Sequence, residues 1–330
     1  MRDFLEDLGH GVHAIDTGYV RPQFDAAYLV VEAGRAAFID CGVNHGVPRL
    51  LQALERLQLT PDCVDWVIPT HVHLDHAGGA GALMQALPDA RLAAHPRGLR
   101  HLLDPSALWA GALAVYGEEE MRRSYGELIP VPAGRAQALA DGEVISLAGR
   151  PLTMLDTPGH ARHHVCVWDE RSRGVFTGDT FGISYREFDT AQGPWIFPTS
   201  SPVQFEPEAM KDSVRRITAL GPEALYLTHY GRVGNVPRLG GMMMELIDAT
   251  VAAMLPLREA DERHERMMAA LRGLYLERLQ AHGCQLAPEV QMRLLAMDVE
   301  LNAQGLAIWL DRRPSDTGAA SASAGSPDRA

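Results

Sequence analysis

The segment Thr70–Gly79, which reads THVHLDHAGG, guides the interpretation of the whole chain. Within six positions it holds four side chains of metal-binding type: His71, His73, Asp75 and His76. Two glycines end the segment. Imidazole and carboxylate groups at this density favour zinc or a similar first-row metal. The preceding apolar stretch VDWVI (64–68) indicates a buried strand, and a helix is expected to start near Asp75. The four side chains would therefore lie in a strand-to-helix turn.

Three more candidate ligands each follow a short apolar run that is typical of a strand: His160, Asp179 and His229. They stand in the motifs DTPGH (156–160), TGD (177–179) and TH (228–229). Because each polar residue comes directly after a predicted strand, we expect a site at the strand ends, where loops carry the chemistry. Each residue alone is a weak signal, but together with the first motif they form one set of ligands.

In this order, the motifs resemble those of the metallo-β-lactamase superfamily. The resemblance covers roughly residues 10–240 and rests on THVHLDHAGG, TPGH (157–160), GD (178–179) and THYG (228–231). Asp40, at the end of AAFID, matches an early structural aspartate of that family. The resemblance implies an α/β (α+β) fold, a four-layer αββα sandwich with the metals at one edge of two sheets.

The same resemblance implies which residues hold which ion. One ion would be bound by His71, His73 and His160. The second would be bound by Asp75, His76 and His229, and Asp179 would bridge the two. Asp75 and Asp179 are the expected catalytic carboxylates. We therefore expect two divalent ions, zinc first, with iron or manganese as alternatives that accept the same ligand types.

Within the superfamily, the pattern is most similar to glyoxalase II-like thioester hydrolases and to lactonases, which keep the full binuclear set. Antibiotic-hydrolysing members commonly have cysteine at the position of Asp179, so a β-lactamase is not expected. After TPGH, residues 161–164 read ARHH in place of the small residues of the glyoxalase-like pattern, which does not favour glutathione thioesters. The stretch TFGISYREFD (180–189) resembles one in uncharacterised bacterial members.

The expected reaction is hydrolysis by a hydroxide that bridges two metal ions. Metal binding lowers the pKa of water from about 15.7 to about 7, so this nucleophile exists at neutral pH. One ion can also polarise the scissile carbonyl. We expect a binuclear hydrolase of a small ester, thioester or lactone. Three alternatives stay open: a mononuclear iron protein of the sulfur dioxygenase type, a phosphodiesterase of the same fold, and a binding protein without turnover.

Asp40 and His164 are expected to support the ligands through hydrogen bonds rather than to bind metal themselves. Asp40 would hold an imidazole or the loop of Asp75, and His164 would act as a structural hydrogen-bonding group. Tyr230, next to His229, is a candidate donor to a substrate oxygen.

The long segment 180–205 leaves Asp179 directly and is predicted to form a wall of the substrate site. Two of its residues are candidate substrate contacts. Tyr185 would donate to an oxyanion, and Arg186 would hold a carboxylate or phosphate by a planar two-point contact.

Composition limits the partners of the chain. The 330 residues carry a formal charge of −12, which argues against a broad nucleic-acid surface because that surface needs clustered cations. No uninterrupted run of 18 apolar residues occurs, so no membrane-spanning helix is expected. The beginning, MRDFLEDLGH, lacks an apolar signal segment. The four cysteines include no CxxC pair and favour a reducing, cytoplasmic compartment. A small molecule is the expected partner.

The chain is predicted to have three parts: a metal hydrolase domain (1–240), a helical extension (241–313) and a disordered tail (314–330). The first part should contain hairpins over 26–40 and 144–155 and helices over 47–57, 80–87, 106–126 and 207–220. The extension should contain helices over 241–255, 259–282 and 287–310. These helices should pack on the first domain or against a second subunit of a homodimer.

Overall fold

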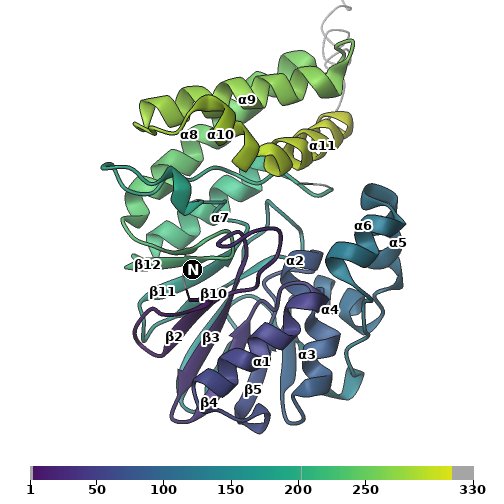
Figure 1. Ribbon diagram of the computed structural model, residues 1–330, viewed down its shortest axis with the longest axis vertical. Helices are drawn as coiled ribbons and strands as arrows, with labels where there is room; N and C mark the ends of the chain where they lie inside the picture. Colours follow the sequence, from purple (N-terminus) through teal and green to yellow (C-terminus); the bar gives the residue numbers. More distant parts are fainter. Residues whose placement is uncertain (1–2, 202, 314–330) are drawn as a thin grey trace, which may run out of the picture.

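Two β-sheets packed face to face form the centre of the fold (Figure 1). The structure, a computed structural model, describes residues 3–201 and 203–313 and, within helix α5, leaves the side chains of residues 115 and 116 undescribed. The predicted disordered tail, 314–330, lies outside the described residues.

The first sheet has seven strands in sequential order. They are β1 (Leu5–Asp7), β2 (Val12–Asp16), β3 (Ala26–Glu32), β4 (Arg35–Ile39), β5 (Val64–Ile68), β6 (Arg91–Ala94) and β7 (Ala136–Ala138). Strands β1 to β4 are antiparallel to their neighbours, and β4 to β7 run parallel. The predicted hairpin is confirmed, with Tyr28 opposite Ile39 and a tight turn at residues 33–34.

The second sheet has six strands in the order β13-β12-β11-β10-β9-β8. They are β8 (Val144–Leu147), β9 (Arg150–Asp156), β10 (Val165–Asp169), β11 (Gly174–Gly178), β12 (Ala224–Leu227) and β13 (Gly231–Val233). All neighbours are antiparallel except β11 and β12, which are joined by a helical crossover and run parallel. The second predicted hairpin, β8 with β9, is also confirmed.

Helices cover the outer face of each sheet, which confirms the predicted αββα sandwich. On the first sheet lie α1 (Val47–Arg56), α2 (Leu74–Ala77), α3 (Ala80–Ala86) and α4 (Pro96–Leu103). Helix α7 (Pro207–Ala219) packs on the second sheet. It begins at Pro207, whose fixed φ suits a first turn, and stops before Gly221, whose positive φ of 63° few side chains adopt. Between the sheets, Tyr28, Phe176 and Tyr226 pack edge to face or stacked.

An insertion after α4 stands beside the sandwich (Figure 1). It consists of α5 (Ser106–Tyr116), α6 (Glu118–Glu120) and a π-helical turn (Met121–Tyr125). The sequence of α5, SALWAGALAVY, is apolar on every side, yet most of its described side chains are half-buried or exposed. An apolar helix that the fold leaves partly uncovered has a surface available for a ligand.

The C-terminal helices form a layer above the second sheet (Figure 1). They are α8 (Val236–Met254), α9 (Arg263–Ala281), α10 (Pro288–Leu294) and α11 (Ala296–Arg312). The helix predicted over 287–310 is therefore two helices with a break at Leu295. Helix α8 begins before the predicted boundary at residue 241, and Leu271 and Leu306 share one apolar core with Val175 of the sheet. The helical layer is thus continuous with the sandwich.

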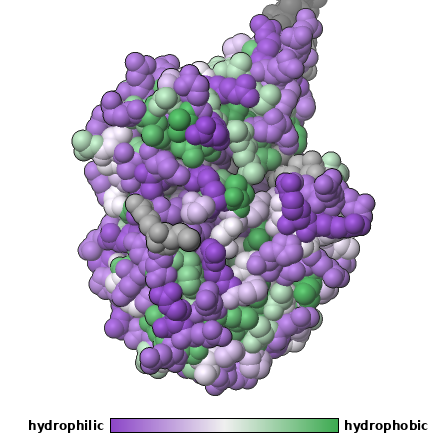
Figure 2. All heavy atoms as spheres, in the orientation of Figure 1, coloured by the Kyte–Doolittle hydropathy of each residue, from purple (hydrophilic) through white to green (hydrophobic). Residues whose placement is uncertain are grey.

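One segment, Val236–Leu257, is long and apolar enough by composition to cross a membrane. This differs from the expectation of no membrane-spanning helix, because charged residues such as Arg238 and Glu245 interrupt the apolar run in the sequence. A buried core helix passes the same test, and 39% of the most apolar window is buried here. Met243 and Ile247 are fully buried in the core, so the segment is weak evidence for a membrane span. The face in Figure 2 is mostly hydrophilic, with scattered apolar patches.

Candidate metal centre

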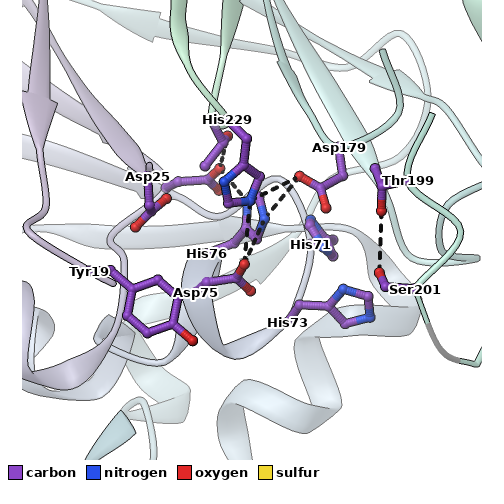
Figure 3. A network of polar contacts seen from close by, with 12 residues as sticks. Tyr19, Asp25, His71, His73, Asp75, His76, Asp179, Thr199, Ser201 and His229 are labelled. Atoms are coloured by element: carbon purple, nitrogen blue, oxygen red, sulfur yellow. Dashed lines mark hydrogen bonds and ion pairs between the residues drawn. The ribbon is translucent and has the colours of Figure 1, made fainter. Parts of the chain in front are cut away.

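The seven predicted ligands meet at one edge of the sandwich, each carried just beyond a strand. Figure 3 shows six of them: His71, His73, Asp75, His76, Asp179 and His229. The loop after β5 and the short helix α2 carry the residues of the first motif: His71, His73, Asp75 and His76. The turn after β9 carries His160, the end of β11 leads into Asp179, and the link between β12 and β13 carries His229. The loop ends thus bring together residues that lie far apart in the sequence.

Three imidazoles converge in the first group of ligands. His160 Nε2 lies 3.2 Å from His71 Nε2 and 3.0 Å from His73 Nδ1. Asp179 completes the group, with its Oδ2 3.4 Å from His160 Nε2. Three nitrogens and one carboxylate oxygen in this arrangement form a donor set suited to a four-coordinate divalent ion.

The second group consists of Asp75, His76 and His229. His229 Nε2 lies 3.4 Å from Asp75 Oδ2, and His76 Nε2 lies 3.8 Å from the same oxygen. The other Asp179 oxygen, Oδ1, is 3.1 Å from His76 Nε2 and 3.6 Å from His229 Nε2. Asp179 therefore contacts both groups, one with each carboxylate oxygen, as expected of a bridging ligand.

The surroundings of these atoms fit a metal ion. Among the described residues, His76 Nε2 and Asp179 Oδ1 are buried without a hydrogen-bond partner. Buried polar atoms nearly always have a partner, and a cation between them would serve both. The donor types, imidazole and carboxylate, suit zinc, iron or manganese. The two adjacent donor groups fit a pair of divalent ions.

Hydrogen bonds on the far side of the rings orient the imidazoles. His76 Nδ1 donates to Asp40 Oδ2 at 2.8 Å, and His229 Nδ1 donates to the Phe24 carbonyl at 2.8 Å. Thr199 Oγ lies 3.2 Å from His160 Nδ1. Each of these contacts leaves Nε2 free to face the ligand cluster, which is how proteins fix the tautomer of a metal-binding histidine.

Asp40 anchors more than one loop of the site. Its Oδ1 accepts from the Thr70 amide at 2.7 Å, and its Oδ2 accepts from the Thr228 hydroxyl at 2.8 Å. These threonines directly precede His71 and His229 in the chain. One buried carboxylate thus ties the first motif to the last one.

His164 lies behind Asp179 and does not belong to either group of candidate ligands. Its Nε2 accepts from the Asp179 amide at 3.1 Å, and its Nδ1 is 3.0 Å from the Thr157 hydroxyl. It therefore links the TPGH loop to the loop of Asp179, in line with the predicted structural role.

Burial and mutual charge set the protonation of the ligands in the metal-free chain. Burial lowers the pKa of His73 to about 3 and also lowers the pKa of His71 and His160, so these rings are neutral. Burial acts the same way on His229, but the carboxylates of Asp179 and Asp75 outweigh it and raise its pKa to about 10. The first group therefore presents neutral lone pairs, while the second is a charge-paired cluster.

The predicted substrate contacts are placed unevenly. Tyr185 lines a small cavity beside the ligands, with its hydroxyl bonded to Asp298. Arg186 instead donates to the carbonyl of Ser184 at 2.7 Å and pairs with Asp189 at 3.2 Å. Tyr230 packs between the sheets. Neither Arg186 nor Tyr230 lines the two cavities that the described residues form at the site, so their substrate contacts stay predictions without a geometric basis.

A cavity of about 300 Å³ opens against the ligands His73, Asp75 and Asp179. Much of the remaining lining is apolar and comes from α5, the C-terminal end of the 180–205 segment and α11. These elements contribute Ala107, Leu108, Gly111, Ala112, Val203 and Leu301. His101 and His163, which were not among the predicted site residues, also line it. Neither residue belongs to a recognisable motif, so the sequence did not predict that it lines the cavity. The only indication was that His163 is next to His164.

Two buried carboxyl groups near the site were also missed. Asp25 lies beside His229 and Asp75 (Figure 3), and Thr17 Oγ donates to it at 2.6 Å. Burial raises the pKa of Asp25 to about 7. Asp298 reaches the site from α11. Neither residue stands in a recognisable motif, so only the tertiary structure reveals them.

Comparison with known proteins defines the class of the chain. Residues 20–229 match the metallo-β-lactamase superfamily, and the chain belongs to that family. It is 27% identical over 233 residues to a metallo-β-lactamase fold-containing protein of Sulfurisphaera tokodaii, covering 68% of this chain and 79% of that one. It is 30% identical over 179 residues to an acyl-coenzyme A thioesterase of Gallus gallus, which is 52% of this chain and 63% of that protein.

A third relative is the atrochrysone carboxyl ACP thioesterase of Aspergillus fumigatus, 31% identical over 117 residues, or 36% of this chain and 27% of that one. Among solved structures, a metallo-β-lactamase family protein of Thermus thermophilus has a TM-score of 0.66 at 20% identity, covering 92% of this chain and 94% of that one. This likeness confirms the fold.

Proposed function

We propose that this chain is a binuclear metal-dependent hydrolase of acyl esters or thioesters whose acyl group is apolar. The observation that carries the proposal is that members of both ligand groups, His73, Asp75 and Asp179, line the larger cavity together with an apolar surface from α5. A carbonyl group at the ligands and a hydrocarbon chain against α5 would use both walls at once. Relatives named as thioesterases of acyl-coenzyme A and of an acyl carrier protein support the same substrate class.

The side chains have distinct tasks in this reaction. Two divalent ions, when bound, supply an activated water at neutral pH and an electrophile for the carbonyl oxygen. Asp179 keeps the two groups at a fixed separation, because each of its oxygens faces one of them. Asp40 and the Phe24 carbonyl fix the ring orientation of His76 and His229. The apolar side chains of α5 bind the acyl chain and exclude bulk water from its side of the cavity.

The cavity walls disfavour the phosphodiesterase alternative. Among the described residues that line the larger cavity, none is lysine or arginine. Enzymes that act on phosphoesters commonly add cationic side chains to the metal ions, since these stabilise the phosphoryl oxygens. An acyl chain needs no such group, and its burial contributes about 0.8 kcal/mol per methylene.

Metal analysis and a substrate panel test the proposal together. The protein, purified without chelator and supplemented with zinc, should carry two equivalents of metal and hydrolyse S-hexanoyl-N-acetylcysteamine faster than the S-acetyl analogue. Activity should disappear with a chelator and return with zinc. Matched hexanoyl esters, lactones and a phosphodiester complete the panel.

Turnover of the phosphodiester alone would replace the proposal with the alternative. A single equivalent of iron with oxygen-dependent chemistry would do the same in favour of a dioxygenase. Full metal loading with no turnover of any acyl substrate would contradict the hydrolase assignment itself.

A further inference from the structure

A second, smaller cavity of about 60 Å³ meets the larger one at the metal ligands. Five residues line both cavities: Asp75, Tyr125, Asp179, Ser201 and Leu301. The larger cavity also reaches α5, whereas the smaller one also reaches Asp298 and Asn302 of α11. A substrate with its reacting carbon at the ligands would therefore place its two arms in different surroundings.

Asp298 is the polar group of the small cavity that keeps capacity for another hydrogen bond. It is 6% exposed, and the Tyr185 hydroxyl lies 3.1 Å from its Oδ1 and 3.2 Å from its Oδ2. That hydroxyl has one proton, whereas a carboxylate offers about four acceptor positions. Much of the acceptor capacity of Asp298 is therefore left for a ligand.

Its neighbour Asn302 is already committed. The Asn302 amide nitrogen lies 3.3 Å from the Pro198 carbonyl and 3.1 Å from the Tyr275 hydroxyl, and its oxygen accepts from the Ser200 amide at 2.7 Å. These bonds hold α11 on the 180–205 loop, so Asn302 positions the helix while Asp298 faces the cavity.

The small cavity has no lysine or arginine among the described residues that line it, although His229 does line it. Arg21 lies nearby, with its guanidinium 4.5 Å from the centre of the Tyr185 ring, but it forms an ion pair with Glu187 at 2.6 Å. Burial of a carboxylate is costly and raises the pKa of Asp298 to about 7, although the charges of His229 and Arg21 act against this shift. A hydrogen-bond donor from a ligand would offset this cost.

We propose that the small cavity is a subsite for a hydroxyl or ammonium group on the non-acyl arm of the substrate, with Asp298 as the residue that selects it. The inference rests on the proposed hydrolase function and adds a specificity to it. The acyl arm lies against α5, and the leaving arm places a hydrogen-bond donor at Asp298. An anionic group at the end of the leaving arm is disfavoured, because it would face the Asp298 carboxylate.

Binding of three matched amides tests the subsite without requiring turnover. N-aminoethyl, N-hydroxyethyl and N-propyl hexanamide share the acyl arm and end in an ammonium, a hydroxyl and a methyl group. Calorimetric titration of the zinc-loaded protein should show the ammonium or the hydroxyl probe binding at least about fivefold more tightly than the methyl probe, the range of one hydrogen bond. The better of the two identifies the natural donor.

Variants then assign the preference to Asp298. Asp298→Asn should reduce the ammonium preference to near unity with little change for the methyl probe. Asp311→Asn, an exposed carboxylate of the same helix that pairs with Arg263 at 2.7 Å, should leave all three affinities unchanged. Met297→Arg places a cation at an exposed position of the cavity wall and should also remove the ammonium preference. This second variant keeps the test valid if Asp298→Asn, a buried substitution, disturbs folding.

Equal affinity of the three probes for the unmodified protein would overturn the inference. So would a preference for the ammonium or hydroxyl probe that survives in both Asp298→Asn and Met297→Arg. The underlying function fails separately: a donor preference that depends on Asp298 without turnover of any hexanoyl ester or thioester would retain the subsite and reject the hydrolase.

Discussion

The strand ends that carry the metal ligands differ from the helices opposite them in how each is held in place. On the ligand side, buried hydrogen bonds fix the rings, and Asp40 alone joins His76, Thr70 and Thr228. On the substrate side, α5 presents small and apolar residues, many of them half-buried or exposed, and Asp298 has a single tyrosine as its side-chain partner. The chemistry thus depends on a rigid scaffold. The choice of substrate depends on other surfaces, which can be changed by substitution without altering that scaffold.

If this contrast holds, changes on the ligand side should affect every substrate, and changes on the substrate side should alter the ratio between substrates. Four predictions test it, in decreasing order of expected effect.

Asp179→Ala should have the largest effect, because both ligand groups lose a donor. We expect loss of both metal equivalents and a fall in kcat/KM of more than about 100-fold on all acyl substrates, beyond the range of outer-sphere changes. Asp75→Ala should release mainly one equivalent. Elemental analysis and kinetics check both variants. Full metal content and full turnover in either one would show that its carboxylate is not a ligand.

Asp40→Asn should weaken metal binding by about 10–100-fold. The substitution keeps the shape of the side chain but removes the carboxylate that accepts the hydrogen bond from His76 Nδ1. The loss should be the same for long and short acyl substrates. Competition with a chromophoric chelator measures the affinity. Thr199→Val, which removes one hydroxyl contact from His160, is the matched milder change. A larger loss from the threonine would reverse the assignment of the main anchor.

Ala112→Phe fills the larger cavity from α5 and should lower the preference for hexanoyl over acetyl thioesters by about tenfold, the contribution of about two buried methylenes. Metal content should not change. Ala110→Phe, on the exposed side of the same helix, is the control and should keep the preference. An equal loss on both thioesters would mean that α5 supports the metal centre and does not select the acyl chain.

Asp298→Asn should have the smallest effect, a shift in the pH dependence of stability. Burial raises the pKa of this acid from 3.8 to about 7, so the folded state binds a proton that the unfolded state has released. Stability from this group is present below its unfolded pKa and is lost as pH rises towards 7. The melting temperature of the variant relative to the parent should therefore rise by about 2 °C or more between pH 5 and pH 8. A constant difference would place Asp298 in a more polar setting.

Much of the ligand side could be predicted from the sequence, because its signals are local. Each ligand follows an apolar strand within a few residues, so hydrophobic pattern and polar motif together placed His71, His160 and His229. The same reasoning gave the two hairpins and the start of α7 at Pro207. It failed at α8, where Val236 precedes the predicted boundary, and at Leu295, where one apolar pattern conceals a break between two helices.

The substrate side could not be predicted in the same way. Tyr185 and Arg186 are neighbours in the sequence, yet the loop turns the first towards the cavity and the second towards Asp189. Asp298 lies in a predicted amphipathic helix, and the pattern of that helix predicts only one buried and one exposed face. Its role as a cavity wall depends on how α11 packs on the 180–205 loop through Asn302.

By itself, the sequence determined the family, the sandwich and the metal-binding residue types, because short-range patterns of strand, turn and ligand encode them. Only the tertiary structure decided that α5 lines the larger cavity, that Asp298 of α11 lines the smaller one, and that Asp25 and Asp298 lie buried beside the metal ligands. These facts depend on contacts between segments more than 100 residues apart, such as Tyr185 with Asp298. Such contacts follow from the packing of whole elements, which no local pattern specifies.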